Sequence, residues 1–273
     1  MIGFKSLQKS LESLIEQDTL GQGFIFFGPE GVGKKTFALA LAQYLESGVF
    51  DEAVGWCTDL KIISPQGKTI GIDEAREVRS YLSQTPLSSS RKMIVVDDAH
   101  KLTPQAQNAL LKIVEEPPAH SFIILIAHDY ELLLPTLFSR LPKIYFAPLA
   151  ISEVSSWLLE KGVERGRAEQ LARRARGAPG LAWRFEFDED LRFIYDAVHR
   201  LLRSSPSEVA ATLKTMVVED KFDVLTFLDA LIVIVQEEKK NGRFMTTALT
   251  MRREAATFNL NYRLQLEYLF SLI

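Results

Sequence analysis

Residues 28–36, Gly-Pro-Glu-Gly-Val-Gly-Lys-Lys-Thr, constrain the fold more than any other segment of this chain. They follow a short apolar run at 24–27 and lead into an alanine- and leucine-rich stretch at 34–45. The sequence therefore predicts a strand, a glycine loop and a helix in succession, which is the setting of phosphate-binding loops. In such loops, backbone N–H groups and the N-terminus of the helix cradle an anion.

Lys35 stands where the phosphate-loop pattern requires a serine or threonine. The missing hydroxyl normally ligates Mg²⁺, whereas an ammonium offers three donors and no lone pair. Thr36 lies one helical step of about 100° further on, so it does not replace this ligand. Two interpretations stay open. Either the N–H groups of residues 30–35, with Lys34, contact the phosphates of ATP or ADP, or the loop is a glycine-rich turn without a ligand.

Two carboxylates, Asp97 and Asp98, end the apolar run at 93–96. In phosphate-loop proteins the first acid at such a place holds Mg²⁺, and a second acid, usually glutamate, polarises the attacking water. Asp98 is one methylene shorter than glutamate, and a misplacement of about 1 Å can cost roughly 100-fold in rate. The alternative is a solvated pair of acids that ends a strand. The predicted nucleotide contacts are Gly28, Gly31, Gly33, Lys34, Lys35, Thr36, Asp97 and Asp98.

Further short apolar runs at 60–63, 122–126 and 144–146 alternate with helical patterns at 73–82, 103–116 and 135–140. This alternation predicts an α/β domain, residues 1–148, with a parallel five-stranded sheet covered by helices on both faces. No strand pattern follows Pro148, so residues 149–188 and 189–273 are predicted to form two all-helical units.

The composition excludes several classes of protein. The net charge of −3 argues against nucleic-acid binding by bulk electrostatics alone. Cys57 is the only cysteine, so no intrachain disulfide can form and four zinc ligands are lacking around it. The apolar run at 224–235 is too short to span a bilayer and carries Asp229. We expect a cytoplasmic protein with no membrane association and no metal site.

Three other groups each have two interpretations. Arg140, after Ser139, either complements the dipole of a short helix or acts as an arginine finger on a neighbour's nucleotide. His128, which follows the strand at 122–126, is either structural or a sensor of the γ-phosphate. The basic side chains Arg91, Lys92, Lys101 and Lys112 are either solvated or face a DNA backbone.

A set of motifs resembles one protein family. The most specific is Asn-Ala-Leu-Leu-Lys at 108–112, followed by Glu-Glu-Pro-Pro at 115–118. Residues 95–102, 137–141 and 259–267 also match the family's acidic strand end, Ser-Arg-Cys motif and closing helix. With the loop at 28–36, the chain resembles the delta prime family of bacterial DNA polymerase III clamp-loader subunits along nearly its whole length.

The resemblance implies an AAA+ architecture with a helical lid at 149–188 and a helical collar for oligomerisation at 189–273. It implies a hetero-pentamer with tau or gamma and delta subunits, which places the sliding clamp on primer-template DNA contacted through phosphates. Within that DNA polymerase III holoenzyme, a DNA-directed DNA polymerase, the chain would be a stator with little or no ATPase activity of its own. Ser139 and Arg140 would serve catalysis in trans at a neighbour's ATP site.

The chain departs from this family at several positions. The stretch at 46–59 is too short for the usual four-cysteine module, so no zinc is expected. Leu141 replaces the cysteine of the Ser-Arg-Cys motif, and residues 179–181, where many AAA+ lids carry an arginine, contain none. Two other hypotheses remain: an active gamma-like ATPase motor, suggested by Lys34, Thr36 and Asp97, and a small-molecule phosphotransferase, for which no second substrate signature is present.

Overall fold

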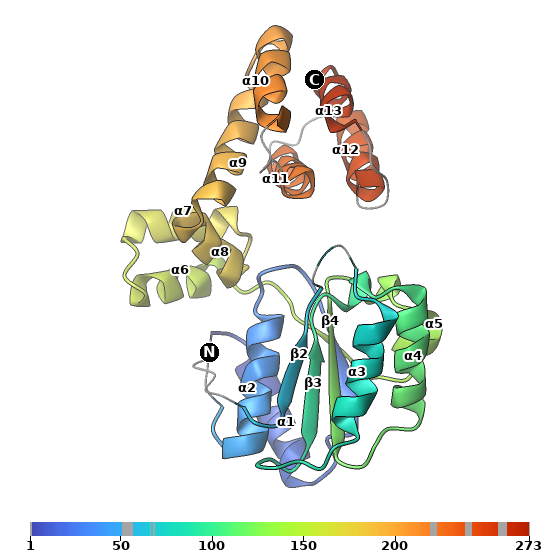
Figure 1. Ribbon diagram of the computed structural model, residues 1–273. Helices are drawn as coiled ribbons and strands as arrows, with labels where there is room; N and C mark the ends of the chain where they lie inside the picture. Colours follow the sequence, from blue (N-terminus) through green and yellow to red (C-terminus); the bar gives the residue numbers. More distant parts are fainter. Residues whose placement is uncertain are drawn as a thin grey trace. The chain divides into compact units, whose positions relative to one another are not determined.

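The computed structural model describes residues 2–50, 57–65, 67, 69–218, 223–237, 242–255 and 261–272. By its contacts the chain divides into two compact units, Met1–Trp183 and Arg184–Ile273. The first unit carries all the strands among these residues (Figure 1). The division at residues 148 and 188 that the sequence suggests stays a prediction.

The first unit is built on a five-stranded sheet in the order β2-β3-β4-β1-β5. All four strand pairs are parallel, with Ile25 of β1 level with Leu125 of β4 and with Lys143 of β5. The strands are β1 Gly23–Phe27, β2 Leu60–Ile63, β3 Lys92–Val96, β4 Ser121–Ala127 and β5 Lys143–Tyr145. The predicted fold class, a parallel five-stranded sheet of the phosphate-loop type followed by helices, is confirmed.

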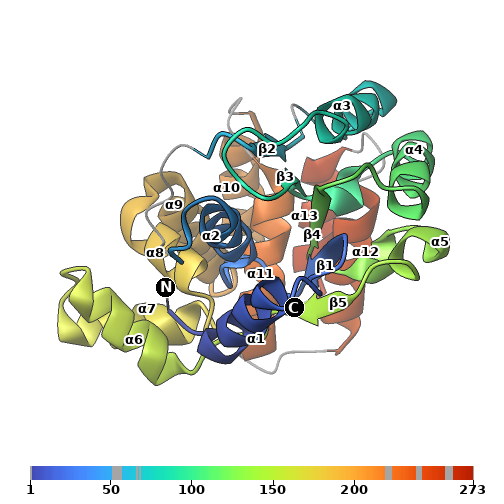
Figure 2. The same ribbon diagram turned by 90° about the horizontal axis from the view of Figure 1, so that it is seen from below.

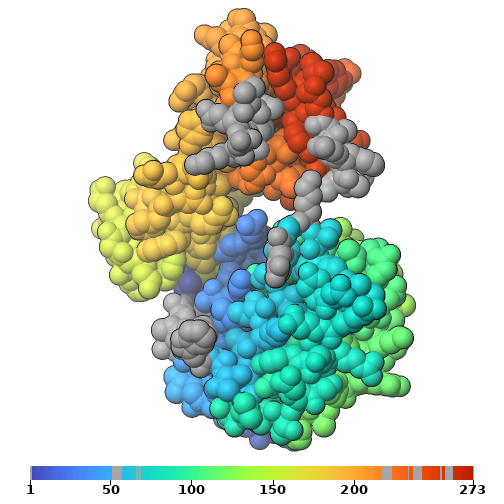
Figure 3. Space-filling model, viewed as in Figure 1, coloured from blue at the N-terminus to red at the C-terminus, as the bar shows by residue number. Residues whose placement is uncertain are grey.

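Helices cover both faces of this sheet (Figure 2). The helices of this α/β part are α1 Lys5–Glu16, α2 Lys34–Ser47, α3 Ile72–Leu82, α4 Pro104–Glu115 and α5 Pro135–Phe138, with 3₁₀ turns η1 Ala99–Lys101 and η2 Tyr130–Leu132. One core joins α1 and α2 to the phenylalanine-rich face of the strands, around Phe26 and Phe37. The other joins α3, α4 and α5 to the aliphatic face, around Ile94 and Leu110. Figure 3 shows α3 and α4, in teal and green, at the surface of this part.

The period-two alternation of the buried strands produces these two cores. In β1, Phe24 and Phe26 face α2, whereas Ile25 between them faces α4. Because successive side chains of a strand point to opposite faces, a strand that is apolar throughout must be covered on both sides. This arrangement places the loop after β1 and the acids after β3 at the same edge of the sheet.

The remaining elements are helical. The first unit continues with α6 Ile151–Glu160 and α7 Arg165–Arg174, which pack on each other, and with the start of α8 Pro179–Phe187. The second unit holds α9 Glu189–Leu201, α10 Pro206–Val218, α11 Val224–Glu237, α12 Gly242–Ala255 and α13 Tyr262–Phe270. Within it, α11 packs on α9 and α12, and α13 packs on α10 and α12. None of the helices in the described ranges has the length and apolar character needed to cross a bilayer.

Most predicted elements lie within two residues of their observed bounds. Helix α4 begins as its sequence predicts, with the Thr103 hydroxyl accepting the Ala106 N–H at 3.2 Å and with proline in its first turn. Helix α5 is shorter than predicted and ends at Phe138, so Ser139 is its C-cap and Arg140 lies beyond it. Residues 259 and 260 of the predicted closing helix lie outside the described residues, and Asn261 caps α13.

Candidate functional site

The loop between β1 and α2 has the backbone shape of a phosphate loop. Gly28 has φ 133° and Gly31 has φ 74°, values that side-chain-bearing residues rarely adopt. A Cβ at Gly28 would lie 2.4 Å from the carbonyl oxygen of Phe146, so only glycine fits there. Gly33 also has a positive φ, of 104°, and caps the N-terminus of α2. The three predicted glycines therefore set the path of the loop.

Lys34 holds this loop closed on itself. Its Nζ donates to the carbonyl oxygens of Gly28 and Pro29, both at 2.7 Å, and the residue is buried. Burial lowers the pKa of Lys34, while the negative charges of Glu30 and Asp97 oppose that shift. An ammonium has three donors, and the two loop carbonyls account for two of them. Lys34 thus fixes the path of the loop through these two bonds.

Lys35 forms an ion pair with the first acid of the second motif. Its Nζ lies 2.8 Å from Oδ2 of Asp97, and the two side chains are 47% and 21% exposed. The other carboxylate oxygen of Asp97, Oδ1, accepts the backbone N–H of Asp98 at 3.1 Å. Both oxygens of Asp97 therefore have donors from the chain itself. Thr36 is exposed on the first turn of α2.

Asp98 is also paired with a lysine. Oδ2 of Asp98 accepts a hydrogen bond from Lys101 Nζ at 2.8 Å. Burial favours the neutral acid, but this bond and the positive charge of Lys101, with contributions from His100 and His128, hold the pKa of Asp98 below its ordinary value. The rings of His100 and His128 are 3.7 Å apart, centroid to centroid. The side chain that would polarise an attacking water is therefore an ionised carboxylate engaged by an internal cation.

The first turn of α8 contacts the loop at the place where the resemblance led us to look for an arginine. The backbone N–H of Gly180 donates to the carbonyl oxygen of Gly31 at 2.8 Å. A Cβ at Gly31 would come within 2.8 Å of the backbone nitrogen of Leu181. Residues 180 and 181 therefore approach the loop through their backbone, and no cationic side chain is presented from these two positions.

Arg140 is anchored at a different place in the same unit. Its Nη1 donates to the carbonyl oxygen of Thr136 at 2.6 Å, and its Nη2 lies 2.6 Å from Oε1 of Glu115, the last residue of α4. The Ser139 hydroxyl donates to the same Thr136 carbonyl at 3.2 Å. Leu141, which follows, is buried in the aliphatic core. The guanidinium is thus partly exposed, on a segment fixed to the core.

The phosphate loop and Arg140 lie at opposite edges of the sheet. The N–H of Ile25 donates to the carbonyl oxygen of Pro142 at 2.9 Å, so the segment after Arg140 is level with the start of β1. Gly28 lies beyond the other end of that strand, three residues or about 10 Å further along. Glu115 likewise precedes β4, at the amino edge of the strands. The structure brings Lys35 to Asp97, but it keeps Ser139 and Arg140 away from this site.

Two of the basic side chains that the sequence suggested could face DNA, Lys92 and Arg91, are engaged within the chain instead. Lys92 cannot face a DNA backbone, because it is buried and pairs with Asp59 at 2.8 Å. Arg91 pairs with Asp18 at 3.3 Å and donates to the Gly21 carbonyl, so its guanidinium is engaged within the chain. The sequence did not indicate Asp59 and Asp18 as the partners of these two cations, because each acid is distant in sequence from the cation that it binds.

The sequence also did not indicate Glu115 as the partner of Arg140 or Lys101 as the partner of Asp98. The first pair joins α4 to the end of α5, which only the tertiary packing brings together. The second pair has i,i+3 spacing, which is a detectable signal. Across the described ranges, no cluster of three or more histidine, cysteine or acidic side chains is arranged to hold a metal ion.

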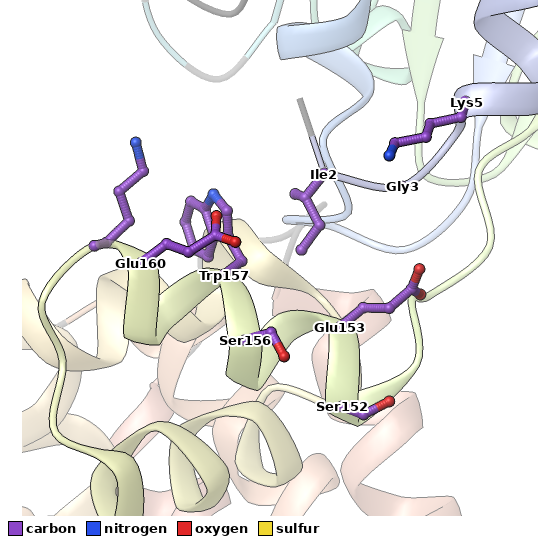
Figure 4. Close-up of a pocket in the computed structure, with 9 residues that line it drawn as sticks. Ile2, Gly3, Lys5, Ser152, Glu153, Ser156, Trp157 and Glu160 are labelled. Carbon is purple, nitrogen blue, oxygen red and sulfur yellow. The ribbon is translucent and has the colours of Figure 1, made fainter.

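A separate pocket of about 470 Å³ lies between the N-terminal segment and α6 (Figure 4). In the close-up, Trp157 and Glu160 of α6 lie on one side of it and Ile2 and Lys5 on the other. None of the side chains predicted from the motifs lines this pocket. We therefore locate the candidate site at the loop and the strand ends, not in this pocket.

Comparison with known proteins gives a consistent set of relatives. The family model described as "DNA polymerase III, delta subunit" matches residues 4–150. The chain is 32% identical over 178 residues to DNA polymerase III subunit delta' of Bacillus subtilis, covering 61% of this chain and 54% of that protein. It is 30% identical over 154 residues to DNA polymerase III subunit gamma/tau of Mycobacterium bovis, covering 51% of this chain and 27% of that one. The matches thus span about half, or less, of these relatives.

Two solved structures share the fold. A DNA polymerase III gamma subunit-related protein of Thermotoga maritima superimposes with a TM-score of 0.59 at 22% identity, over 97% of each chain. The RuvB Holliday junction branch migration motor of the same organism gives a TM-score of 0.50 at 17% identity, over 98% of this chain and 82% of that one. At these identities the likeness concerns the fold alone.

Proposed function

This chain belongs to the DNA polymerase III delta subunit family, within the AAA+ clamp-loader proteins, and we propose that it acts as a delta prime-like stator in a replicative clamp loader. In this role it assembles with tau or gamma and delta subunits, helps place a sliding clamp on primer-template DNA, and supplies Arg140 to a neighbour's ATP site. The chain therefore contributes a catalytic arginine to the ATP site of another subunit but does not hydrolyse nucleotide at its own loop.

The observation that carries this proposal is the position of Arg140 at the sheet edge opposite the chain's own loop. An arginine finger stabilises the negative charge that develops on the transferring phosphoryl group, so it must reach the γ-phosphate. Arg140 precedes β5, whereas Gly28 follows β1, and the two strands are parallel. A guanidinium placed there serves a nucleotide held by another subunit.

The pairing of Arg140 with Glu115 gives the guanidinium a defined starting position. The two side chains are 38% and 40% exposed, so the pair is partly solvated. Ion pairs of this kind contribute up to about 1 kcal/mol, which a γ-phosphate with its larger charge can outcompete. Glu115 therefore orients Arg140 without locking it.

The contacts at the chain's own loop support the proposal that this chain does not hydrolyse ATP itself. Asp97 and Asp98, which would hold the metal ion and activate water, are each engaged by a lysine of the same chain. The residues present do not fit a catalytic Mg²⁺, because the position of the ligating hydroxyl is occupied by the ammonium of Lys35.

The test is reconstitution with the motor subunits, delta, clamp and primed DNA from the same source. Arg140→Ala is expected to leave assembly intact and to lower DNA-stimulated ATP turnover at the neighbouring site on the order of 10³-fold or more, with loss of clamp loading. Arg76→Ala is the matched control, because Arg76 is an exposed arginine paired with a helix carboxylate in the same unit. Glu115→Gln, which removes only the orienting charge, should fall between the two.

If the assembled Arg140→Ala complex hydrolyses ATP and loads clamps at the wild-type rate, the finger assignment is wrong. The second candidate is a gamma-like motor, which the likeness to gamma/tau subunits favours. Steady ATP turnover by the isolated chain that disappears with Lys34→Ala would select that candidate instead.

A further inference from the structure

The ion pair of Lys35 with Asp97 has a consequence for the metal requirement of the loop. Lys35 occupies the first turn of α2, at the position from which a serine or threonine hydroxyl would reach Mg²⁺. Its Nζ is 2.8 Å from Oδ2 of Asp97, the acid that would hold the same ion. The two protein groups that would bind a metal in a phosphate-loop protein thus bind each other.

Three of the four carboxylate oxygens that a divalent ion would use at this place are already engaged by groups of the same chain. Mg²⁺ requires close to six oxygen atoms at about 2.0–2.1 Å in octahedral geometry. Oδ2 of Asp97 faces the ammonium, Oδ1 accepts the Asp98 N–H, and Oδ2 of Asp98 accepts from Lys101. An ammonium carries no lone pair and would repel a second cation at this distance.

The same ammonium carries the charge that the metal would supply. Lys35 is half-exposed and lies two residues after Gly33, at the N-terminal end of α2, so its ammonium is accessible to a ligand from solvent. Lys34 reaches the loop through its bonds to the Gly28 and Pro29 carbonyls. Two adjacent lysines therefore present positive charge at one anion-binding turn, which is shaped by glycines of positive φ.

We propose that Lys35 is the resident cation of this phosphate loop, so that nucleoside diphosphates and triphosphates bind there without Mg²⁺. The loop is then a nucleotide site that does not depend on a divalent ion. This goes beyond the stator role and does not depend on Arg140.

The experiment measures binding of ADP and ATP to the isolated chain by calorimetry, in EDTA and in millimolar MgCl₂. For the wild type, the affinity is expected to differ by less than about twofold between the two buffers. For Lys35→Thr, which restores the hydroxyl and releases Asp97, Mg²⁺ is expected to raise the affinity by about tenfold or more, the equivalent of one charge-assisted contact.

Lys35→Met is the matched control, because it removes the cation without adding a metal ligand. It is expected to weaken binding in both buffers by about tenfold and to show no response to Mg²⁺. Circular dichroism checks that the variants fold. Because Lys35 is half-exposed, we expect the fold to accommodate both substitutions at this position. Asp97→Asn provides an independent variant, which should also leave binding indifferent to Mg²⁺.

Three results would overturn the proposal. They are a strong Mg²⁺ dependence of the wild type, an indifferent Lys35→Thr variant, and no detectable binding of either nucleotide to the wild type in either buffer. Because the chain is tested alone, failure here is distinct from failure of the Arg140 experiment, which measures turnover at another subunit.

Discussion

Asp59→Asn is the substitution for which the structure gives the clearest magnitude. The Asp59 carboxylate precedes β2 and accepts a hydrogen bond from Lys92 Nζ at 2.8 Å, with the two side chains 2% and 4% exposed. Its Oδ2 also accepts the backbone N–H groups of Leu87, Ser88 and Ser89, at 2.9, 2.7 and 2.8 Å. One carboxylate therefore joins the start of β2, the connection before β3 and the first residue of β3.

Asparagine keeps one oxygen for these N–H groups but leaves the ammonium of Lys92 buried without its counter-charge. Breaking a buried ion pair by removing one partner costs about 3–5 kcal/mol. The three N–H groups add little to this cost, because an amide oxygen can still accept from them and Leu87 is exposed. We therefore expect Asp59→Asn to lower the free energy of unfolding of residues 1–183 by at least about 3 kcal/mol.

The assay is urea unfolding followed by tryptophan fluorescence. All three tryptophans, Trp56, Trp157 and Trp183, lie within residues 1–183, so the signal reports on that unit and not on residues 184–273. With a slope of about 2 kcal/mol per molar urea, a loss of about 3 kcal/mol lowers the midpoint by about 1.5 M. Asp73→Asn is the control, because its pair with Arg76 is exposed and should contribute less than about 1 kcal/mol.

The effect also has a defined pH dependence. Burial alone would raise the pKa of Asp59, but the bonds from Lys92 and the backbone N–H groups hold that pKa well below its ordinary value. A lowered pKa in the folded state gives stability that is complete above the unfolded value of about 3.9 and is lost as the pH falls through the folded value. The difference between wild type and Asp59→Asn should therefore be constant from about pH 5 to 8 and shrink below about pH 4.

The double variant Asp59→Asn/Lys92→Met decides whether the buried charge is the cause. Removing both charges should recover part of the loss, since replacing a whole buried pair by apolar groups is often close to neutral. If Asp59→Asn costs less than about 1 kcal/mol, or if the double variant is no more stable than the single one, the reasoning is refuted.

Two further predictions concern caps and glycines, and both use the same unfolding assay. Thr103→Ala should cost about 1 kcal/mol, because the hydroxyl accepts the Ala106 N–H at the start of α4, whereas Thr103→Ser should recover most of that loss. Gly28→Ala should cost more than Gly33→Ala, by about 1–3 kcal/mol, since both have positive φ but only the Cβ at position 28 would collide with the Phe146 carbonyl. Equal losses at the two glycines would contradict this account of the loop.

The sequence by itself determined the layered fold and the location of the nucleotide-type loop. Strands that are apolar throughout, such as 93–96, must be covered on both faces, and the glycines of the loop at 28–36 fix a turn that other residues rarely adopt. The cap at Thr103 and the proline in the first turn of α4 are likewise local chemistry. Such features are readable because their causes lie within a few residues along the chain.

Only the tertiary structure decided which charges meet. Lys35 lies 62 positions from Asp97 by their numbers, and Lys92 lies 33 from Asp59, so neither pair has a spacing that a helix or a turn would produce. The parallel sheet brings each pair together by placing the ends of separate strands and helices at one edge. For the same reason Arg140 lies at the edge opposite the loop, which motif order could not reveal. The packing of the strands thus determines which charged side chains form ion pairs and which remain apart.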